Sequence, residues 1–266
     1  MSQVSTKKMN LQNKVALVTG VAGPKGIGYA SATRLAREGA SLAVVDVSRE
    51  VHQRAKELEG FGGQVVSFDL DLTKLTNVQG MVRSVLERYG RIDILANIAG
   101  LAPRGSGSGV TEKPFVDLTE KEWSSQIAIN LTTTFNCIKA VLPFMIKQRY
   151  GKIVNMSSCT GTLVSIPGES AYSAAKGAVS GLTKALALEV GEFGITVNAI
   201  APGWIQTGSS LESEIKAGLS TPMKRPGRAE EVANLVAFLA SDDSSYMTGH
   251  DVVIDGGNII QEYKGS

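Results

Sequence analysis

The stretch VALVTGVAGPKGIG, residues 15–28, joins an apolar run to a turn built from small residues. Its first part, Val15–Thr19, is rich in β-branched residues and lacks polar alternation, which predicts a strand covered on both faces. The turn that follows is dense in glycine, and a helical spacing runs from about residue 26 to residue 38. The stretch therefore predicts a strand, a tight turn and a helix in succession.

The same alternation continues along the chain. Further apolar runs predict strands at Ser41–Asp46, Val65–Asp69, Ile92–Ala96, Lys152–Ser157, Thr196–Ile200 and Val252–Ile254. Helical patterns cover about 26–38, 49–60, 74–90, 119–149, 171–193 and 229–241. Strands joined by helical crossovers form parallel sheets, so we predict an α/β fold, a doubly wound parallel sheet with helices on both faces. The 266 residues fit one such domain.

Composition excludes several classes of function. The 27 basic and 25 acidic residues are mixed along the chain, with a net charge of +2 and no basic run that would hold a nucleic-acid backbone. No apolar stretch has the length of a membrane span, and residues 1–10, expected to be flexible, lack a secretory signal. Cys137 and Cys159 are expected as reduced, and the two histidines are too few for a familiar metal site. We therefore expect a cytoplasmic protein that binds neither nucleic acid nor membrane.

The glycine-rich turn has a physical use beyond joining two elements. Glycines let the backbone approach a pyrophosphate, and the N–H groups that start the next helix favour its negative charge. A tight strand-to-helix connection that binds nothing would have the same glycines, so Asp46 is the stronger evidence for dinucleotide binding. It closes the second predicted strand, 18 residues after Gly28, where a carboxylate can accept hydrogen bonds from the ribose hydroxyls of a dinucleotide.

The same carboxylate predicts which dinucleotide binds. Near a 2′-phosphate, Asp46 would add several kcal/mol of repulsion at an effective dielectric of about 20. Lys25 argues the other way because its ammonium could reach that phosphate, although it fits a solvated loop position equally well. We therefore predict NAD as the cofactor, with NADP disfavoured.

Tyr172 and Lys176 stand four residues apart in a predicted helix, so both side chains emerge on one face. An ordinary tyrosine, with a pKa near 10, is a poor base at neutral pH, but a nearby ammonium stabilises the phenolate. Tyr172 would then take a proton from an alcohol or give one to a carbonyl. The pair predicts acid–base catalysis beside a hydride carrier.

With these residues in place, the sequence resembles the short-chain dehydrogenase/reductase family from Leu11 to about Ile260. The resemblance is carried by Thr19-Gly20, Gly26-Ile27-Gly28, Asn97-Ile98-Ala99-Gly100, Asn130, Ser157-Ser158, Tyr172-Ser173-Ala174-Ala175-Lys176, Pro202-Gly203, Thr248-Gly249 and Asp255-Gly256-Gly257. It implies a single Rossmann-type domain with about seven strands, assembled as a homotetramer or a homodimer. It also implies hydride transfer between a nicotinamide and an alcohol or ketone.

The resemblance assigns roles to individual residues. A catalytic tetrad is expected at Asn130, Ser158, Tyr172 and Lys176. Ser158 would bind the substrate oxygen, Asn130 would hold a water that links Lys176 to solvent, and Lys176 would contact the nicotinamide ribose. Together with the positions argued above, the predicted cofactor-binding residues are Gly20, Lys25, Gly26, Ile27, Gly28, Asp46, Asp71, Leu72, Asn97, Ala99, Gly100, Tyr172, Lys176, Pro202, Gly203, Ile205 and Thr207.

Some of these assignments stay open. Asp71 and Leu72 would meet the adenine ring, but Asp69 makes their register ambiguous by two residues. Asn97 suits a structural role as well as ligand binding. After the sixth strand, the Ile205 amide would bind the carboxamide, and the Thr207 hydroxyl could reach the carboxamide or a phosphate.

The chain also departs from the family pattern. Five residues separate Gly20 from Gly26 where most members have three, so the turn must bulge. Ile98 stands where most members have a second asparagine. Residues 101–118 form a long loop with a glycine–serine patch, either a wall of the substrate pocket or surface decoration. Residues 208–226 are expected to form a mobile lid.

The sequence thus predicts an NAD-dependent dehydrogenase for a secondary alcohol or ketone, with no metal. Alternatives are a 3-oxoacyl thioester reductase, which residues 201–257 resemble equally well, and a dinucleotide-sensing protein without turnover. A sugar-nucleotide epimerase is weaker, since little chain follows the sixth strand. The substrate pocket could be lined by Trp204, Cys159, Leu163 and Met223, each of which also suits core or lid packing.

Overall fold

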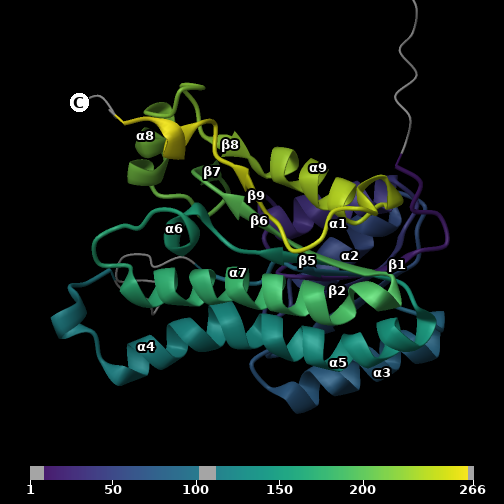
Figure 1. The fold of residues 1–266 in the computed structure, drawn as a ribbon. Helices are drawn as coiled ribbons and strands as arrows, with labels where there is room; N and C mark the ends of the chain where they lie inside the picture. The colour runs from purple at the N-terminus through teal and green to yellow at the C-terminus, as the bar shows by residue number, and fades with distance from the viewer. Residues whose placement is uncertain (1–8, 102–111, 263–266) are drawn as a thin grey trace, which may run out of the picture.

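The computed structural model describes residues 9–101 and 112–262 (Figure 1). Most of the N-terminal segment predicted to be flexible, residues 1–8, lies outside this range. So does the glycine–serine patch of the 101–118 loop, within residues 102–111.

A seven-stranded sheet forms the centre of the molecule, in the order β3-β2-β1-β4-β5-β6-β9. All neighbouring strands run parallel. The strands are β1 (Val15–Thr19), β2 (Ser41–Asp46), β3 (Val65–Asp69), β4 (Ile94–Asn97), β5 (Gly151–Met156), β6 (Ile195–Pro202) and β9 (Asp251–Ile254). Each predicted strand is present, with bounds that differ by two residues at most.

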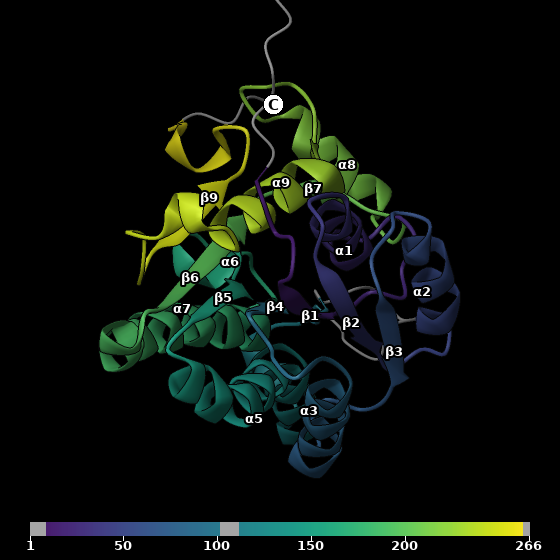
Figure 2. The ribbon, with the colours of Figure 1, turned by 90° about the vertical axis from the view of Figure 1, so that its right-hand side faces the viewer.

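Helices cover both faces of the sheet (Figures 1 and 2). One layer contains α1 (Ile27–Arg37), α2 (Val51–Glu59) and α9 (Ala229–Leu239), and the other contains α3 (Leu75–Tyr89), α5 (Thr133–Gln148) and α7 (Ser170–Val190). Within the layers α1 packs on α9, and α3 packs on α5. The predicted doubly wound α/β fold is confirmed.

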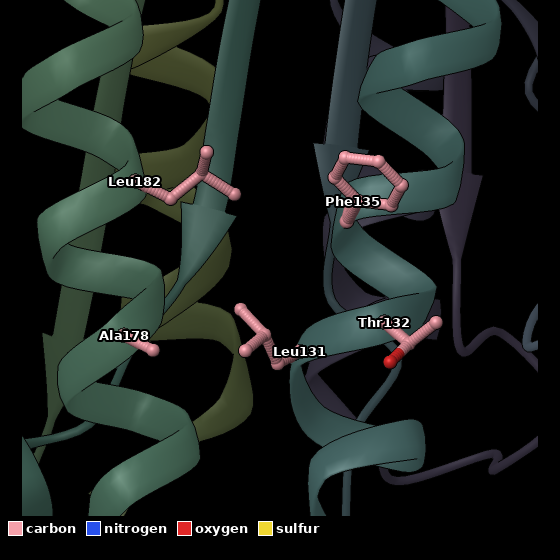
Figure 3. Close-up of a pocket in the computed structure, with 5 residues that line it drawn as sticks. All are labelled: Leu131, Thr132, Phe135, Ala178 and Leu182. Carbon is pink, nitrogen blue, oxygen red and sulfur yellow. The ribbon is translucent and has the colours of Figure 1, made fainter.

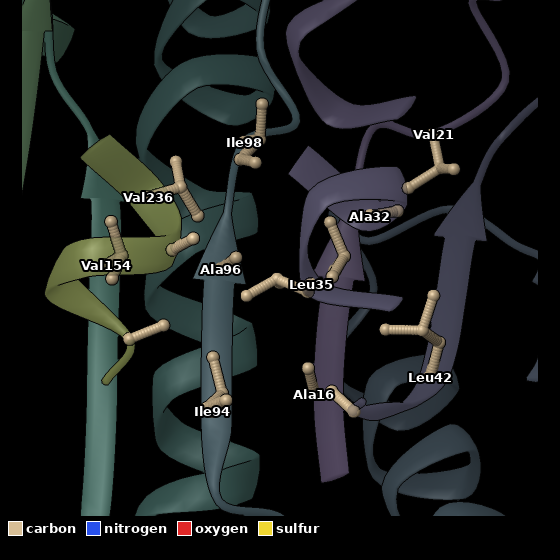
Figure 4. Packing of buried hydrophobic residues seen from close by; sticks show 14 of the residues in the cluster. Ala16, Val21, Ala32, Leu35, Leu42, Ile94, Ala96, Ile98, Val154 and Val236 are labelled. Atoms are coloured by element: carbon tan, nitrogen blue, oxygen red, sulfur yellow. The ribbon is translucent and has the colours of Figure 1, made fainter. Parts of the chain in front are cut away.

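Each helical layer closes over its own apolar core. Because successive strand residues point to opposite faces, Ala16 and Val18 of β1 belong to one core and Leu17 to the other. Figure 4 shows the first core, where Leu35 of α1 and Val236 of α9 pack over β1 and β4. Burial of this kind contributes roughly 1.5–3 kcal/mol for each large side chain. The unbroken apolar strands are thus explained by a sheet buried on both sides.

The helix predicted over 119–149 is present and contains a π-helical turn. It consists of α4 (Glu120–Ile127), a π-helical turn η2 (Ala128–Thr132) and α5. Thr119 and Glu122 form a capping box at its start. By length and composition this continuous helix could cross a membrane, but half of its apolar window is buried in the fold, as in a core helix.

The segment after β6 contains structure that the sequence did not indicate. A two-stranded sheet pairs β7 (Ile205–Gln206) with β8 (Gly227–Arg228), and α8 (Glu212–Leu219) lies between them. This helix falls inside the predicted lid. Its one buried residue is Gly218, and the apolar residues spaced four apart, Leu211, Ile215 and Leu219, are half-buried or exposed. The short turn α6 (Cys159–Thr162), which follows β5, was also missed.

Candidate active site

The candidate site lies at the carboxyl end of the sheet, beyond the neighbouring strands β1 and β4. The chain leaves β1 for α1 on one face and leaves β4 for α4 and α5 on the other. Connections that diverge to opposite faces open a crevice at the strand ends, where ligands of such sheets bind. The predicted site residues on the loops after β1, β2, β4, β5 and β6 all follow carboxyl ends of this sheet.

Two glycines are required by close approach of the backbone. Gly20 has a φ of +77°, and a Cβ there would lie 3.0 Å from backbone atoms of Ala99. A Cβ on Gly28 would lie 2.0 Å from the carbonyl oxygen of Gly20, so only glycine lets α1 begin against the end of β1. The two extra residues of the loop are accommodated in a turn closed by a hydrogen bond from Gly26 N to Gly23 O, 3.0 Å. The bulge is exposed, and Gly20 and Gly28 still pack closely against backbone atoms.

The start of α1 suits a bound anion. Gly26 is its N-cap and provides no side-chain hydrogen bond, so the N–H groups of Ile27 and the next residues stay available. The first turn holds no acidic residue. Lys25 is exposed beside it, with its stem against Gly208, where a Cβ would lie 3.4 Å from Lys25 Cβ. These residues fit the pyrophosphate of a dinucleotide.

Asp46, at the end of β2, faces the same loop. Its Oδ2 accepts a hydrogen bond from Ala22 N at 3.0 Å, and its Oδ1 accepts one from Ser48 N at 3.1 Å. A carboxylate has about four acceptor positions, so capacity remains for ribose hydroxyls. The sequence predicted Asp46 as a ligand, but it did not reveal that Asp46 also fixes the insertion-bearing loop.

After β3, Asp69 and Asp71 lie in different surroundings. Asp69 is engaged in ion pairs with Arg49 (3.5 Å) and His52 (3.2 Å). Asp71 lies beyond the strand end, followed by the buried Leu72. Asp71 Oδ1 accepts hydrogen bonds from Thr73 N at 2.8 Å and from Thr73 Oγ1 at 2.7 Å, so both carboxylates are engaged and the register stays a prediction.

Thr19 ties the ends of β1 and β4 together. Its Oγ1 accepts hydrogen bonds from Ile98 N and Ala99 N, both at 2.9 Å. Asn97 is 2% exposed, and its Nδ2 donates to Asn155 Oδ1 at 2.9 Å, so its side chain lies inside the sheet, as in the structural alternative. Ile98 contributes its backbone at this point, which a second asparagine would do equally well. Thr19 had a signal in the sequence, a hydroxyl closing an apolar strand.

The π-helical turn η2 holds Asn130, which is fully buried. Its Oδ1 accepts from Leu101 N (3.0 Å), and its Nδ2 donates to Leu101 O (3.1 Å) and to Gln126 Oε1 (2.9 Å). A Cβ on Gly100 would lie 2.8 Å from Asn130 Oδ1 and 3.1 Å from Lys176 Nζ. Gly100 therefore lies against both side chains, and the π-turn, typical of functional sites, aims Asn130 at this point.

Lys176 and Tyr172 lie together on α7, as their spacing predicts. Lys176 is 4% exposed, its Nζ donates to Met156 O at 2.8 Å, and it lies 5.8 Å from the centre of the Tyr172 ring. Burial lowers the pKa of Lys176 to about 8. At neutral pH the ammonium form still predominates, so a positive charge is held beside the phenol.

Ser158 begins α6, directly after β5. Its side chain accepts a hydrogen bond from Thr160 N at 3.2 Å. A Cβ on Gly161, whose φ is +92°, would lie 2.2 Å from Ser173 O, and one on Gly177 would lie 2.8 Å from Gly161 O. The α6 turn is thus pressed onto the start of α7, beside the turns that carry the tyrosine and the lysine.

The remaining predicted positions follow β6. Pro202 ends the strand, and Gly203 N donates to Ile254 O at 3.0 Å. A side chain on Gly203 would meet Asp255, with Cβ atoms 2.7 Å apart. From here Ile205, in β7, and then Thr207 lead toward α8.

The four apolar pocket candidates differ in environment. Cys159 is 3% exposed, its thiol donates to Ala201 O at 3.3 Å, and burial raises its pKa to about 12, so it belongs to the core. Leu163 and Met223 are 53% and 60% exposed and lie on the surface of the protein. Trp204 is half-buried after the end of β6.

The chain is similar to several known oxidoreductases. A family model described as enoyl-(acyl carrier protein) reductase matches residues 20–258. The chain is 41% identical to the oxidoreductase UcpA of Salmonella typhimurium, over 95% of this chain and 97% of that protein. It is also 41% identical to the 3-oxoacyl-[acyl-carrier-protein] reductase FabG of Thermotoga maritima, over 95% and 100%. Carveol dehydrogenase from Mycobacterium avium, solved in complex with NAD, superposes with a TM-score of 0.86 at 26% identity, over 95% and 99% of the two chains.

These matches span nearly the whole chain and include the glycine loop, the sheet and the Tyr172–Lys176 helix. The fold and the order of the motifs agree with them. The protein belongs to the short-chain dehydrogenase/reductase family and is an oxidoreductase.

Proposed function

We propose that the protein is an NAD-dependent dehydrogenase that interconverts a secondary alcohol and a ketone, acting in the cytoplasm without a metal ion. The observation that carries the proposal is the buried Lys176 ammonium, held 5.8 Å from the centre of the Tyr172 ring and in contact with the Asn130 turn through Gly100. A fixed cation beside a phenol lowers the cost of forming the phenolate.

The chain's residues divide the work of such a reaction. The glycine loop and the start of α1 would hold the pyrophosphate, Asp46 the adenosine ribose and Lys176 the nicotinamide ribose. When bound, the nicotinamide supplies hydride transfer to or from the carbon of the substrate. Tyr172 would take the hydroxyl proton during oxidation and return it during reduction. Ser158 would donate a hydrogen bond to the substrate oxygen where charge develops. Asn130 would hold a water that connects Lys176 to solvent.

Substitution of Tyr172 tests the reaction. Purified protein is incubated with NAD⁺ or NADP⁺ and a panel of cyclic, aliphatic, sugar and 3-hydroxyacyl alcohols, and reduced cofactor is followed. Turnover of one class should fall by roughly a hundredfold to ten-thousandfold in Tyr172→Phe, because the proton acceptor is lost. Tyr246→Phe, at a fully exposed tyrosine, is the matched control and should retain activity. Equal activity in the two variants would contradict the proposal.

The preference for NAD rests on Asp46, and the NAD-bound carveol dehydrogenase supports it. Asp46→Asn keeps an acceptor for Ala22 N but removes the charge. We expect the ratio of kcat/KM for NADP⁺ to that for NAD⁺ to rise about tenfold or more, because repulsion of the 2′-phosphate is relieved. Asp243→Asn, at an exposed site, should leave the ratio unchanged. A wild-type preference for NADP⁺ would mean that Lys25 outweighs Asp46.

A second candidate function is reduction of a 3-oxoacyl thioester, favoured by the 41% identity to the Thermotoga maritima reductase. Acetoacetyl-coenzyme A with NADPH is the probe. Turnover of this pair faster than of any simple alcohol with NAD⁺ would select the reductase. Tight binding of NADH without any turnover would instead favour a dinucleotide-sensing protein.

We also propose that the protein is a homo-oligomer, a homotetramer or a homodimer, with contacts through α5 and α7. A hollow of about 330 Å³ lies between these helices, lined by Leu131, Thr132, Phe135, Ala178 and Leu182 (Figure 3). Phe135 is 47% exposed, and an apolar surface of this kind typically marks an interface. Phe135→Glu should reduce the mass in analytical ultracentrifugation, whereas an unchanged mass would place the interface elsewhere.

A further inference from the structure

Glu169 is a buried carboxyl group one helical turn before Tyr172. It is the N-cap residue of α7, and its carbonyl oxygen accepts the first hydrogen bond of the helix, from Ser173 N at 2.8 Å. Tyr172 follows three residues later and Lys176 four residues after that, both within α7. Glu169 therefore stands at the start of the helix that carries both reacting groups.

Within the described residues, 9–101 and 112–262, the Glu169 carboxylate forms no hydrogen bond and no ion pair. A carboxylate at this position can cap a helix, but Glu169 makes no side-chain cap hydrogen bond. The residue is only 8% exposed. Its carboxylate oxygens are not among the completely buried side-chain atoms without a hydrogen-bond partner in the described residues. Its oxygens thus keep contact with open space. A mostly buried carboxyl group without partners costs stability unless a ligand satisfies it.

Two more carboxylates approach Glu169 from other segments. Burial, followed by the charges of Glu112 and Glu214, raises the pKa of Glu169 to about 7. Gly168 lies against the first of these segments, since a Cβ there would be 3.2 Å from Lys113 N and 3.5 Å from Glu112 Cβ. Glu214 belongs to α8, inside the predicted lid. The start of α7, the 112–118 segment and α8 therefore bring three carboxylates close enough for their charges to interact.

This negative region does not have the form of a metal site. In the part of the chain that the structure describes, no three His, Cys, Asp or Glu side chains are grouped to hold an ion. A hydrogen-bond donor on an organic substrate is therefore the chemistry that suits Glu169.

We propose that Glu169 is a specificity-determining residue, which accepts a hydrogen bond from a hydroxyl or ammonium group on the substrate, across from the reacting carbon. The inference rests on the proposed dehydrogenase function and narrows its substrates to alcohols that carry such a donor. Three helical residues correspond to a rise of about 4.5 Å, comparable with the separation of groups at positions 1 and 4 of a six-membered ring. Glu112 and Glu214 add a preference for ammonium and disfavour anionic substrates.

Matched alcohols test the proposal. Wild-type protein and Glu169→Gln are compared with NAD⁺ on cyclohexanol, cyclohexane-1,4-diol, trans-4-aminocyclohexanol and 4-hydroxycyclohexanecarboxylate. In the wild type, kcat/KM should be highest for the amino alcohol and lowest for the carboxylate. In Glu169→Gln the ratio between these two should fall about tenfold or more, because a charge-assisted hydrogen bond is lost. An advantage of the diol over cyclohexanol, without one for the amino alcohol, would identify a hydroxyl as the donor.

Two further variants control for indirect effects. Glu189→Gln makes the same change on an exposed residue of the same helix, about 30 Å away, and should leave all ratios unchanged. Glu169→Asp keeps the charge but withdraws it by one methylene, so it should give ratios between those of the wild type and Glu169→Gln.

Binding is measured separately from turnover, by titrating the NADH complex with the same four compounds and following NADH fluorescence. If no alcohol is oxidised but the amino alcohol binds more weakly to Glu169→Gln than to the wild type, the role of Glu169 stands and the proposed reaction fails. If the preferences of the wild type and Glu169→Gln agree in both measurements, or if none of the compounds binds, Glu169 does not determine specificity.

Discussion

Two buried lysines contact opposite ends of the strand β5, and their surroundings differ. Lys152 is 2% exposed near the start of the strand, where Asp242 lies 3.4 Å from its ammonium. Lys176 is 4% exposed, and its ammonium donates to the carbonyl of Met156, the last residue of the strand. Among the described residues, Lys176 has no acidic partner within ion-pair distance. Burial lowers the pKa of both lysines. For Lys152 the charge of Asp242 opposes this effect, whereas for Lys176 burial is the cause of the shift.

The two lysines differ in whether a counter-charge balances the buried ammonium. A buried charge with a counter-charge is balanced where it stands, whereas one without it is costly and is kept where chemistry uses it. Within residues 9–101 and 112–262, the carboxyl end of the sheet holds both Lys176 without a counter-charge and Glu169 without a side-chain partner. The amino end satisfies its charged groups locally. Three predictions sharpen this contrast.

The largest expected effect is on activity. Lys176→Met should lower kcat/KM by about a hundredfold to ten-thousandfold, because the phenolate loses its stabilising cation. The free energy of unfolding should stay unchanged or rise, since an apolar side chain of similar shape replaces an uncompensated charge. Kinetics and urea denaturation measure the two quantities. Lys152→Met is the control and should retain kcat/KM within a fewfold range; comparable loss of activity in both variants would remove the distinction.

The second effect is a pH dependence of stability. Burial and the charges of Glu112 and Glu214 raise the pKa of Glu169 to about 7, above the 4.5 of a free glutamate. Its stabilising contribution is therefore complete below pH 4.5 and is lost as the pH rises through 7. Relative to the wild type, Glu169→Gln should gain about 1–3 kcal/mol of unfolding free energy between pH 5 and pH 8.

Urea denaturation at both pH values measures this gain. Glu189→Gln should show a constant difference from the wild type over the same range. A constant difference for Glu169→Gln as well would mean that the Glu169 carboxyl is solvated in the folded protein, which would break its contrast with the amino end.

The smallest effect is expected at the compensated lysine. Asp242→Asn removes the counter-charge of Lys152 and weakens the hydrogen bond from Tyr150 Oη, 3.0 Å. Because the Asp242 side chain is 66% exposed, solvent screens the loss, and we expect destabilisation of only about 0.5–1 kcal/mol in thermal or urea unfolding. Activity per folded molecule should be unchanged. A lower kcat would show that the two ends of β5 are coupled.

The strands, the layers and the Tyr172–Lys176 pair could be predicted because each depends on local pattern. Apolar runs between helical patterns predict the strands and the helical layers. A spacing of four residues predicts that two side chains share one face of a helix. The helix α8 was not predicted, because its eight residues are shorter than the window over which periodicity separates a helix from a loop. The π-turn at Asn130 also leaves no periodic signal, because it is one turn within a continuous helix.

Side chains that act across distant segments were harder to interpret. For Asn97 the sequence allowed a structural role or ligand binding. Its side chain donates a hydrogen bond to Asn155, 58 residues away, inside the sheet. Thr19 joins two turns about 80 residues apart in sequence. Such pairings depend on which strands become neighbours, and no single stretch of the chain contains that information.

By itself, the sequence determined the doubly wound sheet, the oxidoreductase family and the positions of the glycine loop, Asp46, Tyr172 and Lys176. Only the tertiary structure decided that no described acidic residue pairs with Lys176 and that Glu112 and Glu214 approach Glu169. The physical reason is that burial and electrostatic potential are sums over all groups nearby in space, whereas a sequence motif specifies only neighbours along the chain.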